Sequence, residues 1–214
     1  PYQRLREDNG CALNIKEEDL RQKVREKRIG NTFLFAVDAS GSMGARERMR
    51  AVKGAIFYML QEAYQKRDRV GMIAFRRDKA DLLLPITRSV DLAQKRLAEM
   101  PTGGKTPLAD GLALSLQTLA LLNKRDSELE PILIVVTDGR ANAVHEGEKE
   151  PVAAAISIAE KIAKAKITSV VIDTESDFIK LGIAKKLAAA MQANYYTLQR
   201  LSKENIIHIV RNLN

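Results

Sequence analysis

Five oxygen-bearing side chains lie in three short segments that share a chemical character. They are Asp38, Ser40, Ser42, Thr106 and Asp138. The first three follow an apolar run at 33–37, the last follows an aliphatic run at 132–136, and the remaining one precedes a predicted helix in a loop rich in glycine and proline. Two carboxylates and three hydroxyls are oxygen ligands of the kind that hard divalent cations prefer. The residues therefore form a candidate site for Mg2+ or Mn2+.

These side chains would meet if their strands belonged to one parallel sheet. From residue 33 onward, short aliphatic runs alternate with longer segments of helical periodicity, which is typical of βαβ units. Ligands of such sheets bind outside the carboxyl ends of the strands, near the point where the strand order reverses. Gly41 has no Cβ, so it would let the chain curl and bring the three side chains of its segment to one point.

The alternation of patterns predicts the individual elements. Strands are predicted at 33–37, 70–75, 80–84, 132–136, 167–172 and 195–198, and helices at 46–66, 90–100, 108–122, 152–165, 178–191 and 203–210. The strand at 80–84 follows a short polar stretch, so we expect it to be an antiparallel hairpin partner at the edge. We predict an α/β fold: a doubly wound, mainly parallel six-stranded sheet with one antiparallel edge strand.

The domain organisation predicted from the sequence is one main domain with an extension. Residues 33–214 form the domain, because the alternation of strands and helices begins there. Residues 1–32 form an N-terminal arm or linker, in which 17–27 could be a charged helix.

Helix capping is the alternative explanation for each segment taken alone. Ser, Thr and Asp are common N-cap residues, and Thr106 precedes a proline that would suit a first helical turn. Taken together, however, the three segments all offer oxygen donors at the ends or beginnings of elements that would meet at one edge of the sheet. This combination favours a metal site over helix capping.

Other site chemistries are less well supported. Residues 104–106 imitate the end of a phosphate-binding loop, but the glycine required five positions earlier is Glu99. An aspartyl phosphotransferase would carry a second aspartate where Ser40 stands. His145 and His208 are far apart and no zinc-ligand spacing occurs.

Composition limits the partners and the compartment. The net charge of +8 raises the possibility of nucleic acid, but the basic residues alternate with acids and only 5% of the residues are aromatic, with no Trp. We therefore do not expect nucleic-acid binding. No apolar run approaches the roughly 20 residues that cross a bilayer, so no membrane partner is expected. The single Cys11 suits a reducing compartment, which predicts a cytoplasmic protein.

The pattern of the candidate ligands resembles a known family. Three segments together resemble the metal-ion-dependent adhesion site of von Willebrand A domains: Asp38-x-Ser40-x-Ser42, Thr106, and Thr-Asp-Gly at 137–139. The resemblance covers about residues 33–212. The resemblance implies that the serines and the threonine contact the ion directly or closely, with one or both aspartates acting through water. It also implies that a Glu or Asp of a partner protein completes the coordination, which is binding and not catalysis.

A narrower resemblance extends beyond the ligands. Residues 38–43, 62–68, 84–90, 101–112 and 137–142, together with the basic stretch 18–28, are similar to the D subunits of magnesium chelatases. This implies a C-terminal module of a larger protein whose upstream AAA+ domain assembles with an AAA+ ATPase subunit ring and acts on a porphyrin-binding subunit. The domain would then be a non-catalytic docking module within a chelatase complex.

Several alternatives remain open at this stage. The domain could be a free-standing von Willebrand A domain that binds an unrelated acidic protein through the same metal, or a metal-free scaffold. Walker motifs upstream of Pro1 would favour the chelatase interpretation. Lys105 would either weaken metal binding or contact an acidic partner, and Asp173 and Glu175 could line the rim of the site.

Overall fold

The computed structural model describes residues 30–41, 46–126, 129–143, 150–175 and 181–198. The predicted helices at 17–27 and 203–210 lie outside the described residues, as do Cys11, His145 and His208.

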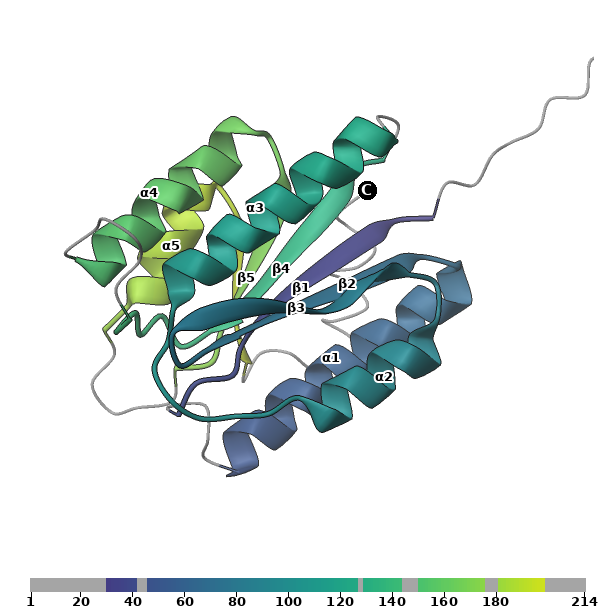
Figure 1. Ribbon diagram of the computed structural model, residues 1–214, viewed down its shortest axis with the longest axis horizontal. Coiled ribbons are helices and arrows are strands. Elements are labelled where there is room, and N and C mark those ends of the chain that lie inside the picture. Colours follow the sequence, from purple (N-terminus) through teal and green to yellow (C-terminus); the bar gives the residue numbers. More distant parts are fainter. Residues whose placement is uncertain (1–29, 42–45, 127–128, 144–149, 176–180, 199–214) are drawn as a thin grey trace, which may run out of the picture.

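A single six-stranded sheet forms the centre of the molecule (Figure 1). Its strands are β1 (Thr32–Asp38), β2 (Arg69–Arg76), β3 (Lys79–Thr87), β4 (Pro131–Thr137), β5 (Thr168–Asp173) and β6 (Asn194–Thr197). The strand order is β3-β2-β1-β4-β5-β6. Among the described strands, the β2–β3 pair is antiparallel and the other pairs are parallel. The predicted fold class is thus confirmed, including the antiparallel edge strand.

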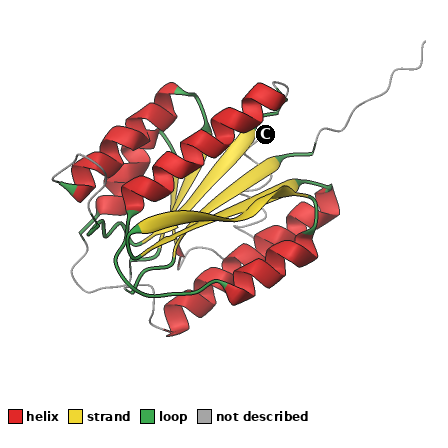
Figure 2. Cartoon of the chain, in the orientation of Figure 1, coloured by secondary structure: helices red, strands yellow, loops and turns green. Residues whose placement is uncertain are grey.

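Five described helices cover the two faces of the sheet. They are α1 (Arg46–Lys66), α2 (Val90–Glu99), α3 (Leu108–Arg125), α4 (Pro151–Lys164) and α5 (Ile183–Met191). Figure 2 shows α1 and α2 on one side and α3, α4 and α5 on the other. Of the helix predicted over 178–191, residues 178–180 lie outside the described residues, and α5 begins at Ile183 after Gly182, which adopts a left-handed conformation with φ 65°. Among the helices that the structure describes, none is long and apolar enough to cross a membrane.

The central strands divide their side chains between two hydrophobic clusters. In β1, Phe33, Phe35 and Val37 pack with α1 and α2, whereas Leu34 and Ala36 pack with α3, α4 and α5. Every residue of β1 and β4 is buried. A strand covered on both faces must be apolar throughout, which is why these runs were recognisable in the sequence.

The edge strand β3 has a different character. Its residues are mostly half-buried or exposed, and Pro85 lies within it. Proline cannot donate to a sheet ladder, so it is tolerated at an edge where one side of the strand has no partner strand. The register between β2 and β3 is irregular around Met72.

Candidate metal centre

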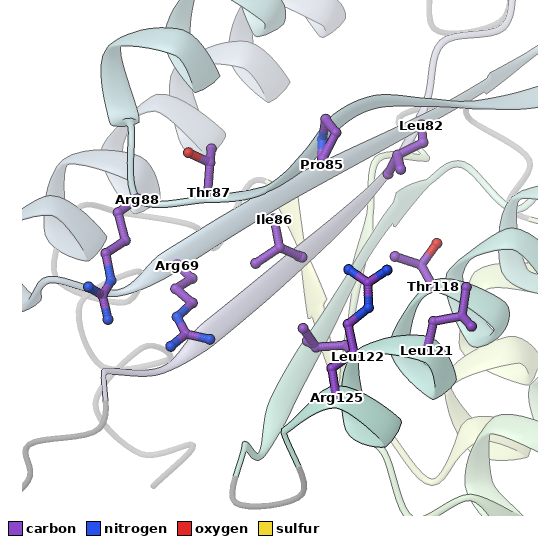
Figure 3. A pocket seen from close by; sticks show the side chains of 10 residues that line it. All are labelled: Arg69, Leu82, Pro85, Ile86, Thr87, Arg88, Thr118, Leu121, Leu122 and Arg125. Carbon is purple, nitrogen blue, oxygen red and sulfur yellow. The ribbon is translucent and has the colours of Figure 1, made fainter.

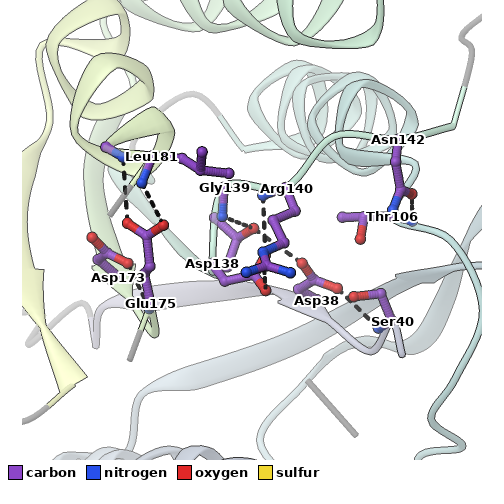
Figure 4. Close-up of polar contacts among 12 residues, drawn as sticks. Asp38, Ser40, Thr106, Asp138, Gly139, Arg140, Asn142, Asp173, Glu175 and Leu181 are labelled. Atoms are coloured by element: carbon purple, nitrogen blue, oxygen red, sulfur yellow. Dashed lines mark hydrogen bonds and ion pairs between the residues drawn. The ribbon is translucent and has the colours of Figure 1, made fainter. Parts of the chain in front are cut away.

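The strand order reverses between β1 and β4, and the two predicted aspartates lie at this point. The strands are parallel neighbours, so Asp38 at the end of β1 and Asp138 just after β4 reach the same edge of the sheet. Their exposed fractions are 0% and 1%. The Thr137 hydroxyl donates a hydrogen bond to Asp38 Oδ2 at 3.1 Å, which joins the two strand ends directly (Figure 4).

The segment after β1 folds back against the loop that carries Thr106. Asp38 Oδ1 accepts the N–H of Ser40 at 2.9 Å, and Ser40 is fully buried. The N–H of Gly41 donates to the carbonyl oxygen of Gly104 at 2.8 Å. A Cβ on Gly41 would lie 3.2 Å from that oxygen, so glycine serves this close approach of two backbones.

Asn142 attaches the same loop to the segment after β4. Its Oδ1 accepts the N–H of Thr106 at 2.6 Å, and its own N–H donates to the Thr106 carbonyl at 3.3 Å. The loop is therefore held from both sides, and the side chains of Asp38, Ser40, Thr106 and Asp138 gather in one region (Figure 4).

The Thr106 hydroxyl is buried, and it has no hydrogen-bond partner among the described residues. It does not cap the following helix, because the N-cap of α3 is Pro107 and no side chain makes a cap hydrogen bond there. A buried hydroxyl without a partner carries a desolvation cost of about 1–3 kcal/mol. Capping therefore does not explain this residue.

Burial changes the acidity of the central carboxyl. It raises the pKa of Asp38 from 3.8 to about 7, and the nearby charge of Asp138 adds to the rise. Hydrogen bonds from Ser40 and Thr137 act in the opposite direction. The site is thus unfavourable for two ionised carboxylates alone, and a cation would relieve that cost.

One arginine already lies beside the second aspartate. Asp138 Oδ1 accepts the N–H of Arg140 at 3.0 Å, and the Arg140 Nε lies 3.8 Å from Asp138 Oδ2. Gly139 between them has φ 77°, and a Cβ there would be 2.5 Å from the backbone nitrogen of Ala184. Only glycine fits this turn.

Four of the five predicted ligands lie in the described part of the chain. The structure brings Asp38, Ser40, Thr106 and Asp138 together, whereas Ser42 lies outside the described residues. Lys105 is exposed although its neighbour is buried. Within the described part of the chain, no group of three or more His, Cys, Asp or Glu could hold a metal ion, so the candidate centre depends on hydroxyls.

Asp173 and Glu175, which we considered as residues of the rim, make structural hydrogen bonds. Both are buried, and Asp173 accepts hydrogen bonds from the N–H of Glu175 and from the Tyr195 hydroxyl. The Glu175 carboxylate accepts the N–H groups of Leu181, at 2.7 Å, and Gly182, at 3.3 Å. These contacts anchor the chain just before α5 and attach β6 to β5.

Three residues that contribute to the site were not singled out from the residues themselves: Thr137, Arg140 and Asn142. The narrower resemblance included them in the stretch 137–142, but it assigned them no role. Their position directly after a buried strand was the available signal.

Comparison with known proteins identifies the family. A model described as the von Willebrand factor type A domain matches residues 33–141, just over half of the chain. The chain belongs to this family. A second model, described as the AAPxQ domain, matches residues 1–25.

Two proteins are similar to this von Willebrand A domain over most of its length. An uncharacterized protein of Methanocaldococcus jannaschii is 46% identical over 173 residues, which cover 80% of this chain and 98% of that protein. The magnesium-chelatase 67 kDa subunit of Heliobacterium mobile is 35% identical over 222 residues, covering 99% of this chain and 33% of the subunit. The chain spans about a third of the length of the magnesium-chelatase subunits it matches. The predicted similarity to these subunits is confirmed.

Solved structures support the fold. The SpRpn10 VWA domain superposes with a TM-score of 0.61 at 13% identity, covering 85% of this chain and 95% of that one. At this level of identity the likeness concerns the fold alone.

Proposed function

We propose that this von Willebrand A domain is a metal-dependent docking module for another protein. The proposed ligands of Mg2+ or Mn2+ are Asp38, Ser40, Ser42, Thr106 and Asp138. A Glu or Asp of the partner protein would complete the coordination. The observation that carries the proposal is the buried Thr106 hydroxyl, which caps no helix and has no hydrogen-bond partner among the described residues.

The charges of the site fit a small divalent cation. Two buried carboxylates adjoin each other, and Arg140 lies against one of them as an opposite charge. Mg2+ takes oxygen ligands and usually retains water, so hydroxyls and two carboxylates suit it better than they suit zinc, which prefers nitrogen and sulfur. When bound, the ion would supply an electrophilic position for a partner carboxylate.

The chain itself would position the ligands and attract the partner. Thr137 and Asn142 hold the strand ends and the loop in place through the contacts described above. Lys105 is exposed beside Thr106. At that position it would meet an acidic partner at the surface of the site and steer its approach.

The similarity to magnesium-chelatase subunits supports a particular assembly. In this assembly, residues 33–214 are the docking domain and residues 1–32 are an arm or linker to an upstream AAA+ region. The domain, not itself catalytic, would couple an AAA+ ATPase subunit to a porphyrin-binding subunit in the cytoplasm.

A second candidate function has its own supporting observation. The relative from Methanocaldococcus jannaschii is matched over 98% of its length, so a protein consisting almost wholly of this domain exists. The alternative is a free-standing domain that binds an unrelated acidic protein through the same metal.

Calorimetric titration with Mg2+ and Mn2+ tests the metal site. The parent should bind, Asp138→Ala should not, and Asp91→Asn should bind like the parent, because Asp91 is an exposed acid in the first turn of α2, outside the site. No heat from the parent at millimolar metal would refute the proposal.

Capture of partner subunits tests the assembly. The domain should retain the ATPase and porphyrin-binding subunits of a chelatase with Mg2+ and lose them with EDTA or with Asp138→Ala. Metal binding without capture of either subunit would favour the free-standing alternative.

A further inference from the structure

A groove between the edge strand β3 and helix α3 lies far from the candidate metal centre. It has a volume of about 570 Å3 (Figure 3). Arg69 begins β2, Thr87 ends the antiparallel β3 and Arg125 ends α3, and all three line the groove. They lie at the amino ends of the parallel strands, whereas Asp38 lies at a carboxyl end. The groove and the metal centre therefore occupy opposite ends of the sheet.

The sides of the groove are apolar and accessible. Leu82 of β3 is 41% exposed and Leu121 of α3 is 53% exposed, and both line it. Ile86 and Leu122 line it as half-buried residues. Large apolar side chains gathered along a concave surface typically mark a binding site, whereas single exposed ones do not.

The charged side chains that the structure describes along the groove are arginines. Arg69, Arg88 and Arg125 contribute to it, and among the described residues no acid lines it. Arg69 lies 3.8 Å from Asp126, but both side chains are partly exposed, at 31% and 41%, so the pair is weak. Within the described part of the chain, neither Arg88 nor Arg125 has an acidic partner. Asp68 lines a neighbouring hollow with Arg88, and its Oδ1 already accepts a backbone N–H.

This combination points to one class of occupant. We propose that the groove docks an acidic peptide segment of a partner protein, with apolar side chains between Leu82 and Leu121 and carboxylates against the arginines. The volume lies in the range of roughly 300–1,000 Å3 that holds a drug-sized ligand, which suits a few side chains of an extended segment. A nucleic acid is disfavoured because no aromatic side chain in the described part of the chain lines the groove to stack a base.

This docking surface is independent of the proposed metal-dependent function. It depends on different residues at the other end of the sheet, so it should bind equally with Mg2+ and with EDTA. If the metal site fails its test, the docking proposal is unaffected. If the groove fails to bind the peptide, the proposed metal site is equally unaffected.

An NMR titration of the 15N-labelled protein tests it. The probe is an octapeptide, acetylated and amidated, in which Asp-Glu and Leu-Leu pairs alternate. At millimolar peptide, backbone amide shifts should change along residues 82–88 and 118–125, with or without EDTA. One comparison peptide replaces the acids with Lys and Arg and another replaces each Leu with Ser; both should bind at least severalfold more weakly.

Matched variants separate the groove from the rest of the surface. Arg125→Glu should weaken the acidic peptide about tenfold, as expected when an attractive charge becomes repulsive. Lys124→Glu makes the same charge change on the same turn outside the groove and should have a much smaller effect. Leu121→Ser should also weaken binding, whereas Leu92→Ser, an exposed leucine on α2, should not. The dispersion of each spectrum reports whether the variant is folded.

Several results would overturn the proposal. The first is an absence of amide shift changes at several millimolar peptide, or changes located outside residues 82–88 and 118–125. The second is binding of the basic peptide or the serine peptide as tight as that of the acidic peptide. The third is binding of the acidic peptide by both Arg125→Glu and Leu121→Ser with the affinity of the parent. An oligothymidylate that shifts the same amides more strongly than the peptide would indicate a nucleic-acid surface and would also overturn it.

Discussion

Substitution of Asp38 by asparagine should stabilise the metal-free domain increasingly as the pH rises. Burial raises the pKa of Asp38 in the folded state from 3.8 to about 7. Well below pH 3.8 the carboxyl is protonated in both states. As the pH rises, the unfolded chain loses the proton first, so the parent loses stability until the pH has passed 7.

The size of this effect follows from the pKa difference. A change from 3.8 to about 7 corresponds to about 4 kcal/mol in the free energy of unfolding, of which about 3 kcal/mol falls between pH 5 and pH 8. Asparagine does not ionise. The stability difference between Asp38→Asn and the parent should therefore grow by about 3 kcal/mol over that interval.

The surroundings of Asp38 accept an amide. Its oxygen would keep the N–H of Ser40, and its nitrogen would face the Thr137 hydroxyl, which can rotate and accept a hydrogen bond. Any free-energy cost that the amide introduces through altered hydrogen bonds is the same at each pH. The change with pH in the stability difference between Asp38→Asn and the parent therefore measures the effect of the buried charge alone.

Urea denaturation followed by circular dichroism, in EDTA at pH 5 to 8, measures the difference. Asp91→Asn is the matched control, because it makes the same substitution at an exposed carboxyl outside the site. With Mg2+ at pH 8, the parent should gain stability and Asp38→Asn should not. A difference for Asp38→Asn that stays constant across the pH range would refute the assigned burial of the charge.

Three further predictions concern the loop and the packing of the helices. Thr106→Val should abolish metal binding in calorimetry while leaving the metal-free protein as stable as the parent or about 1 kcal/mol more stable in urea, because it removes a buried hydroxyl without a described partner; parental affinity would contradict this. Asn142→Ala should destabilise by about 1–2 kcal/mol in urea and weaken Mn2+ binding about tenfold, since it releases the loop; an unchanged affinity would exclude the positioning role. Gly111→Ala should destabilise by about 1–3 kcal/mol, because the new Cβ would lie 2.4 Å from Phe75, whereas Gly54→Ala, also on a helix but in open space, should stabilise by roughly 0.5–1 kcal/mol; thermal melts with equal shifts would contradict the packing.

Much of the fold could be predicted because the central strands have a strong signature. The runs at 33–37 and 132–136 are apolar throughout since both faces of those strands are covered. The edge position of β3 could be anticipated from the polar stretch before it. The left-handed conformation of Gly182 just before α5 could not be predicted, because the apolar periodicity of the sequence runs through that position.

The candidate ligands were also recognisable from local pattern. Asp38 and Asp138 each follow a buried strand, and the parallel sheet topology then requires their strand ends to lie at one edge. This inference needs only the order of the elements.

The energetics and the second surface were decided by tertiary contacts. Asn142 holds Thr106 across 36 positions of sequence, and the raised pKa of Asp38 depends on how completely other segments exclude water from it. The local sequence around Leu82 or around Leu121 does not indicate a binding site. The two residues line one groove only because β3 and α3 pack as neighbours. The sequence by itself determined which elements form and which side chains stand at their ends, because those depend on local periodicity and burial. Only the folded arrangement decided which of these side chains find partners, because that depends on distances between segments remote in the chain.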